Sequence, residues 1–180
     1  MHQYFKSKIE YAYHLTQKGK FFKKARALIV KDDKLLLLKA QYHNGQFNYF
    51  FPGGGVDEGE KPKQTAAREA LEEYGVVVNP TKYLGCSYYK VPLNHNGIDF
   101  ISNRVEYFYA CEYISQLENA EFGLEGEFSY DDRTVSKVAL TLDEIKALPA
   151  VKLGNIPEKT YQKLVSYLET VIEATKCSKK

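Results

Sequence analysis

Residues 54–76, which read GGVDEGEKPKQTAAREALEEYGV, join a glycine-rich loop to a segment rich in carboxylates. The pattern predicts a helix over residues 62–74, because Pro62 suits its first turn, the alanines favour helix and Gly75 suits the position just past its end. The stretch therefore predicts a glycine-rich loop followed by a helix.

Three carboxylates of the predicted helix, Glu69, Glu72 and Glu73, fall on one stripe about 100° wide at 3.6 residues per turn. The opposite face carries the apolar side chains Ala67, Ala70, Leu71 and Tyr74. Like charges at this spacing destabilise a helix, whereas Mg2+ or Mn2+ would be bound by the same carboxylate oxygens. The alternative is a solvated acidic face on which Arg68 pairs with Glu72.

The glycines ahead of the helix, Gly53, Gly54 and Gly55, allow close backbone approach to a ligand and positive φ angles. They lead through residues 56–61 to a helix N-terminus, which favours anions. A glycine loop beside a carboxylate helix suits a metal-bound phosphate ester. The alternative is an ordinary glycine-rich turn.

The whole stretch resembles the signature box of the Nudix hydrolases: Gly, five spacers, Glu, seven spacers, Arg-Glu, an aliphatic residue, any residue, Glu-Glu, any residue, Gly and an aliphatic residue. The matching residues are Gly54, Glu60, Arg68, Glu69, Ala70, Glu72, Glu73, Gly75 and Val76. Ala70 is smaller than the Leu, Ile or Val often found at its position, which bears on packing and leaves the carboxylates untouched.

The resemblance implies an α/β (α+β) fold, a Nudix-type α/β/α sandwich around a mixed β-sheet, as a single domain over residues 1–180. It implies a Mg2+ or Mn2+ cofactor held by Glu69, Glu72 and Glu73. Ion pairs and hydrogen bonds of Arg68 and Glu60 would hold the loop to the helix. We therefore expect catalysis to depend on Glu72, Glu73 and Arg68, and the cofactor-binding loop to comprise Gly53, Gly54, Gly55 and Glu60.

The general base that takes a proton from the attacking water is not fixed by the box. Residues 112–132 carry seven acidic residues and no lysine or arginine. Glu125 and Glu127 flank Gly126 just before a predicted strand, so either is a candidate base. The alternatives are a carboxylate of the box as base and a solvated acidic loop.

The implied activity is hydrolysis of the pyrophosphate linkage of a nucleoside diphosphate joined to another moiety, such as a nucleoside triphosphate, ADP-ribose or a sugar nucleotide. One alternative is a non-catalytic Nudix-fold module that senses nucleotides, although such modules usually lack some box carboxylates. The other is an RNA 5′-end pyrophosphohydrolase, suggested by seven basic residues and one acid within residues 1–26. Pro92 resembles a proline of the ADP-ribose branch, and it also suits an ordinary turn.

Further elements follow from periodicity and turn residues. We expect an N-terminal helix over about residues 3–17, a hairpin of strands 25–30 and 35–39, and a strand 47–51 that Pro52 and the glycines must end. Further predicted elements are strands at 76–78, 83–90, 104–114 and 134–140, a turn at 94–97 and helices at 142–148 and about 157–174.

The composition of the 180-residue chain is that of a globular protein, with a formal net charge of +2 that is too small to argue for nucleic acid. No apolar run reaches the roughly 20 residues that span a bilayer, and no secretory signal is found. The three scattered cysteines, Cys86, Cys111 and Cys177, favour a reducing cytoplasm. A homodimer is left open. Four histidines stand isolated in the sequence, and four aromatic residues could stack on a base: Phe47, Tyr49, Tyr88 and Tyr89.

Overall fold

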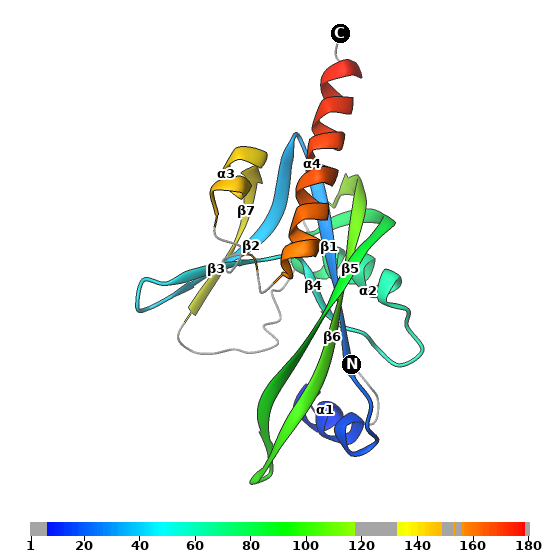
Figure 1. Cartoon of the computed structure of the whole chain (residues 1–180), viewed down its shortest axis with the longest axis vertical. Helices are drawn as coiled ribbons and strands as arrows, with labels where there is room; N and C mark the ends of the chain where they lie inside the picture. Colours follow the sequence, from blue (N-terminus) through cyan, green and yellow to red (C-terminus); the bar gives the residue numbers. More distant parts are fainter. Residues whose placement is uncertain (1–6, 118–132, 149–152, 154–155, 179–180) are drawn as a thin grey trace.

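The computed structural model describes residues 7–117, 133–148, 153 and 156–178 of the chain. Within these ranges, seven strands form one mixed sheet with the path β3-β2-β1-β6-β5, while β4 pairs with β1 and β7 with β2 (Figure 1). The strands are β1 (Phe22–Lys31), β2 (Lys34–Tyr42), β3 (Phe47–Phe50), β4 (Gly53–Gly55), β5 (Val76–His95), β6 (Ile98–Gln116) and β7 (Arg133–Thr141). Helices lie on both faces, so the predicted α/β sandwich is confirmed.

Strands β1 and β2 form the predicted hairpin. Its turn uses Asp32 and Asp33 at φ angles of 50° and 61°, a conformation that aspartate tolerates better than most residues. On its other side β1 pairs in parallel with β6, from Phe22 opposite Arg104 to Val30 opposite Glu112. Strand β1 therefore lies in the centre of the sheet, with neighbours that come from distant parts of the sequence.

The prediction that Pro52 and the glycines end the strand at 47–51 is confirmed, because β3 ends at Phe50. The glycines themselves nevertheless form a further strand. Gly53, Gly54 and Gly55 form β4 and pair antiparallel with Arg26, Ala25 and Lys24 of β1. Glycine suits this strand, because a Cβ on Gly53 would meet β1 and a Cβ on Gly54 would meet Glu69. The glycine loop is thereby fixed to the central strand.

Strands β5 and β6 form one long hairpin in which the separately predicted strands 76–78 and 83–90 are continuous. The predicted turn at residues 94–97 is confirmed, with Asn96 and Gly97 at φ angles of 51° and 82°. Register shifts near Val77, Pro80 and Tyr83 bend β5 without ending it. The hairpin extends beyond the body of the sheet toward helix α1 (Figure 1).

The helices pack on the sheet through small and aliphatic side chains. Helix α2 (Pro62–Glu69) contributes Ala66 to a core with Ala25, Ala27 and Ile29 of β1. Helix α4 (Glu158–Ser178) packs Leu164 and Leu168 on the opposite face, in a core that includes Leu28, Phe51, Phe108 and Ile145, the last from α3 (Leu142–Ala147). Helix α1 (Lys8–Gln17) covers Phe22 and Phe100 near the end of the long hairpin.

The described part of α1 begins after the N-cap Ser7, five residues later than the predicted start at residue 3, and residues 3–6 lie outside the described part. It ends before Gly19, at a φ of 63°, as predicted. No helix in the described ranges has the length and apolar composition needed to cross a membrane.

Candidate active site

The helix that carries the candidate carboxylates begins as the sequence predicts. Pro62 is at its first position, and the N–H of Lys61 donates to Oε1 of Gln64 at 2.9 Å, which satisfies one backbone group at the helix start. Gly75 follows the helix in the left-handed conformation, at a φ of 80°. Both ends of the segment are therefore set by local sequence.

The second half of this segment differs from the prediction of one regular helix over 62–74. Residues 62–69 are α-helical, whereas Ala70–Tyr74 form a π-helical turn. Such turns are rare and are often found at functional sites. Positions after Glu69 therefore do not follow the 100° spacing, and Glu72 and Glu73 diverge in their contacts.

Glu60 and Arg68 join the loop to the helix, as the resemblance implied. The guanidinium donates from Nε to Oε1 and from Nη2 to Oε2 of Glu60, both at 3.1 Å, and from Nη2 to the carbonyl of Gly55 at 3.0 Å. Thr65 Oγ1 and the N–H of Asp57 also donate to Glu60 Oε2, at 2.7 and 3.1 Å. The loop is thus bound to the helix at several points.

This network shifts two pKa values in the directions that favour charge. Burial of Glu60 would raise its pKa, but the hydrogen bonds from Arg68, Thr65 and Asp57 outweigh it and lower the pKa below its ordinary value. Burial of Arg68 would lower its pKa, but Glu60 and the neighbouring carboxylates raise it well above the usual range. Both groups are therefore charged at neutral pH.

Two candidate metal-binding carboxylates converge on the same atom of Arg68. Its Nη1 lies 2.8 Å from Oε1 of Glu69 and 2.7 Å from Oε2 of Glu72. Glu72 is about half exposed, whereas Glu69 is only 8% exposed. The three carboxylates of the predicted stripe therefore differ in exposure, and Glu69 is buried next to the glycine strand.

The glycine strand lies directly against the carboxylates of Glu69 and Glu73. Glu73 Oε2 accepts the N–H of Gly53 at 2.6 Å. A Cβ placed on Gly54 would lie 2.6 Å from Cδ of Glu69, which is too close for any side chain. Gly53 and Gly54 thus lie between Glu69 and Glu73, and the absence of side chains is what lets the carboxylates approach.

The predicted positive φ angles occur at only one of these glycines. Gly53 has a φ of 154°, and a Cβ there would meet the carbonyl of Ala25 and lie 2.9 Å from Cα of Arg26. Gly54 and Gly55 have no positive φ. Glycine is needed at position 54 because a side chain would not fit beside Glu69. The carbonyl of Gly55 accepts a hydrogen bond from Arg68.

The carboxylates suit a hard divalent cation in chemistry, although they are not gathered around one point. Within the described ranges, no group of three or more His, Cys, Asp or Glu side chains is close enough to hold a metal ion. Oxygens of Glu69 and Glu72 nevertheless both lie within hydrogen-bond distance of Arg68 Nη1. Glu73 accepts the N–H of Gly53. Carboxylate oxygens are donors that hard divalent cations accept, and in this structure the Arg68 guanidinium lies between those of Glu69 and Glu72.

The remaining candidates lie elsewhere or outside the description. Glu125 and Glu127 fall in residues 118–132, which are outside the described part of the chain. His95 packs on Tyr13 with ring centroids 5.0 Å apart, and His43 is exposed in a turn.

The aromatic candidates form two separate groups. Phe47 and Tyr49 pack edge to face on β3, with centroids 5.5 Å apart. Tyr88 packs on Phe21 and is 68% exposed. Its neighbour Tyr89 is partly buried, and this burial raises the pKa of Tyr89 to about 12. None has a contact that assigns it to a bound base.

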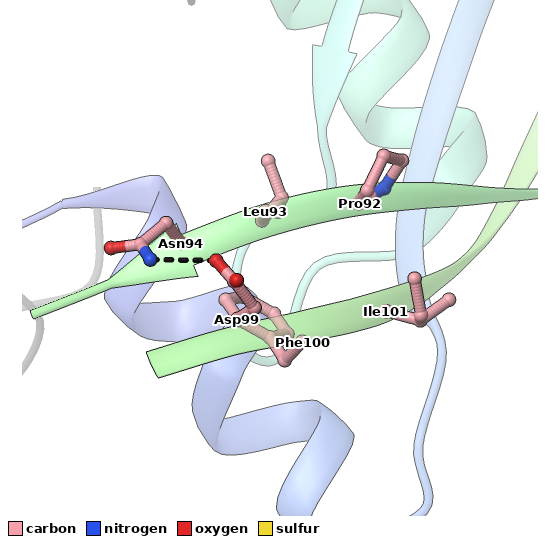
Figure 2. Close-up of a pocket in the computed structure, with 6 residues that line it drawn as sticks. All are labelled: Pro92, Leu93, Asn94, Asp99, Phe100 and Ile101. Carbon is pink, nitrogen blue, oxygen red and sulfur yellow. Dashed lines mark hydrogen bonds between the residues drawn. The ribbon is translucent and has the colours of Figure 1, made fainter. Parts of the chain in front are cut away.

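Pro92 lines a pocket of about 540 Å³ on the long hairpin (Figure 2). The other lining residues are Leu93, Asn94, Asp99, Phe100 and Ile101. Asn94 Nδ2 donates to Asp99 Oδ1 at 2.7 Å across this pocket. The pocket contains no residue of the carboxylate helix.

Sequence reasoning missed two residues next to the glycine strand, Arg26 and Glu106. Arg26 donates to the carbonyls of Phe51 and Gly53, at 3.1 and 2.6 Å, and pairs with Glu106. The signal was present, because Arg26 is the one charged residue within the apolar run 25–30. A charge inside a buried strand requires a partner.

Comparison with known proteins agrees with this geometry. The family model of the NUDIX domain matches residues 21–163, which span β1 to the first part of α4. The chain belongs to the Nudix family. The match includes the glycine strand, the carboxylate helix and the long hairpin, so the resemblance inferred from the box is confirmed over most of this Nudix protein.

Curated relatives match a shorter part. An RNA pyrophosphohydrolase of Aliivibrio fischeri (strain MJ11) is 42% identical over 52 residues, which are 27% of this chain and 31% of that protein. The corresponding protein of Vibrio cholerae (serotype O1) is 40% identical over 52 residues. The Nudix chain thus spans about a third of the length of these relatives.

Solved structures match over a longer range. A NUDIX hydrolase from Nitrosomonas europaea has a TM-score of 0.56 and 21% identity, with 82% of this chain and 88% of that chain covered. A UDP-X diphosphatase has a TM-score of 0.51 and 18% identity, with 89% and 70% covered. At such identities the similarity supports the fold of the Nudix protein.

Proposed function

We propose that this Nudix hydrolase cleaves the pyrophosphate linkage of a nucleoside diphosphate joined to another moiety, with Mg2+ or Mn2+ as cofactor. The observation that supports it is the placement of Glu69 and Glu73 against the Gly53–Gly54 backbone, with Glu72 held beside Glu69 by Arg68. A complete set of box carboxylates argues against the non-catalytic nucleotide-sensing alternative.

The roles of the residues follow from their contacts. Glu69, Glu72 and Glu73 would hold the metal, which when bound neutralises phosphoryl oxygens and lowers the pKa of water. Arg68 positions Glu69 and Glu72, and Glu60 holds Arg68 in place. A carboxylate must take the proton of the attacking water, and Glu125, Glu127 or a box glutamate could serve.

A second candidate function is RNA 5′-end pyrophosphohydrolysis. It is supported by the identity of 42% over 52 residues with the Aliivibrio fischeri RNA pyrophosphohydrolase. The basic N-terminal region contributes exposed lysines at Lys18, Lys20 and Lys23, which favour a polyanionic substrate. The same metal chemistry would serve either substrate.

The deciding experiment is a substrate panel with and without Mg2+ or Mn2+. It contains nucleoside triphosphates, ADP-ribose, dinucleoside polyphosphates, sugar nucleotides and a 5′-triphosphorylated RNA oligonucleotide, with phosphate, pyrophosphate and nucleoside monophosphate measured as products. Metal-dependent cleavage of a nucleotide supports the first proposal, and preference for RNA supports the second. Binding without cleavage of any of these supports the sensing alternative.

Light scattering in the same buffers determines whether the chain is a homodimer.

A further inference from the structure

Arg26 and Glu106 form an ion pair on the sheet face opposite the carboxylate helix. Nε of Arg26 donates to Oε1 of Glu106 at 2.5 Å, and the two side chains are 15% and 6% exposed. Removing two charges from water is costly, and replacing such a pair by apolar residues is often neutral for stability. The stability of the sheet therefore does not by itself explain why this ion pair is present.

The other end of the Arg26 guanidinium reaches the glycine strand. Its Nη1 donates to the carbonyls of Phe51 and Gly53 at 3.1 and 2.6 Å. The N–H of Ala27 donates to the carbonyl of Pro52 at 2.8 Å. Strand β1 thus binds the successive carbonyls of residues 51–53. Two of these hydrogen bonds come from the side chain of Arg26, and the third comes from the backbone of Ala27.

The peptide held in this way also contacts the carboxylate helix. The N–H of Gly53 donates to Glu73 Oε2 at 2.6 Å. A continuous series of hydrogen bonds and backbone therefore runs from Glu106 through Arg26 and Gly53 to Glu73. Space around Gly53 is too small for a Cβ, so β4 has little freedom to shift against β1.

We propose that Arg26, oriented by Glu106, is a positioning residue that fixes the Gly53 amide and through it the carboxylate of Glu73 for metal binding. The proposal rests on the proposed function, because it assigns Glu73 to the metal. A planar guanidinium can hold Glu106 and two carbonyls at once, whereas a lysine ammonium is a single flexible point charge. Arg26 does not itself touch the substrate in this proposal.

The test is Arg26→Lys, which keeps the charge beside Glu106 and removes the planar donor fork. Mn2+ binding is measured by calorimetry in the absence of nucleotide, and kcat and KM are measured on the substrate found in the panel. We expect Mn2+ affinity and kcat each to fall about tenfold or more, as when partners of metal ligands are lost, with a smaller change in KM.

The matched control is Arg104→Lys. Arg104 is also in the sheet and only 6% exposed, and its side chain packs over the ring of Phe22 at 5.0 Å. The same substitution there should lower the melting temperature without changing Mn2+ affinity. A second pair of variants, Glu106→Ala and Glu106→Gln, separates loss of the Arg26 anchor from loss of its charge, because glutamine keeps an acceptor oxygen.

The outcomes separate the two levels of the proposal. A parent protein that neither binds Mn2+ nor cleaves any nucleotide overturns the proposed function. A parent that does both, with a folded Arg26→Lys variant of equal Mn2+ affinity and kcat, overturns the positioning role alone. Equal losses of Mn2+ affinity in Arg26→Lys and Arg104→Lys also overturn it. If Arg26→Lys does not fold, weaker Mn2+ binding by Glu106→Ala than by Glu106→Gln supports the role, and equal binding overturns it.

Discussion

Glu72 and Glu73 are adjacent in the chain but hold different partners. Glu72 is half exposed and pairs with Arg68, whereas Glu73 is bound to the Gly53 amide. Each carries a charge that the proposed metal needs, and neither fills the hydrophobic core. Substitutions at these two residues therefore test chemistry more directly than stability.

We predict that Glu72→Gln and Glu73→Gln each lower kcat by ~10^2-fold or more, because each removes a metal-binding charge. Steady-state rates at saturating Mg2+ and thermal unfolding are the measurements. The control is Glu173→Gln, an exposed carboxylate on α4. Parent-like rates in both helix variants would show that this helix does not hold the metal.

Gly54 provides a second test. We predict that Gly54→Ala lowers activity strongly, because the new Cβ would displace the carboxylate of Glu69, whose Cδ would lie 2.6 Å away. Activity is compared with that of Gly97→Ala, where φ is 82° and nothing lies within 4 Å. The control should lose stability by about 1 kcal/mol from backbone strain and keep its activity. Normal turnover by Gly54→Ala would mean that Glu69 can move freely without consequence.

Among the elements, the loop between β4 and α2 depends on the ionised form of Glu60. The folded-state pKa of Glu60 is lowered, so its contribution to stability is present above its unfolded pKa and is lost as pH falls through the folded value. We predict that Glu60→Gln is less stable than the parent at pH 7. The difference should shrink once the pH falls below the ordinary value of about 4.3.

Urea unfolding of both proteins between pH 7 and pH 3 measures this difference. Glu173→Gln serves as the reference, because it makes the same substitution at an exposed carboxylate on α4. A constant difference between Glu60→Gln and the parent over the whole range would contradict the network around Glu60.

The elements also show where sequence reasoning works and where it stops. Pro62 and Gly75 identified the ends of the carboxylate segment, because start and stop signals are local. The π-helical turn at Ala70–Tyr74 and the short strand Gly53–Gly55 were not predictable from local sequence. The strand forms by pairing with β1, and the turn packs Ala70 and Tyr74 into a core that distant strands complete. The contacts of Glu73 and the burial of Glu69 depend on those two elements.

The proposed mechanism needs a general base, which can lie outside the carboxylate helix. Glu125 and Glu127 are candidates from the sequence pattern. We predict that one of Glu125→Gln and Glu127→Gln lowers kcat by ~10^2-fold with little change in Mn2+ affinity, and that the acidic limb of its pH–rate profile disappears. Near-normal kcat and an unchanged acidic limb in both variants would move the base to the helix.

The sandwich itself was predictable, because the Nudix box and the alternation of strands and helices determine it together. Arg26 and Glu106 were not recognised as part of the site, since they are 80 residues apart in the chain and meet only through the parallel pairing of β1 with β6. A sequence pattern records spacing along the chain and carries no direct record of such a contact.

That parallel pairing has a consequence for how the chain folds. The β5–β6 hairpin closes through a short turn and can form within microseconds, whereas β1 must wait for a partner that begins 76 residues after its own start. During synthesis β1 therefore emerges long before β6 exists. The ion pair of Arg26 with Glu106 can form only when these two strands meet, so the surroundings of the candidate metal-binding carboxylates are completed only after β6 has paired with β1.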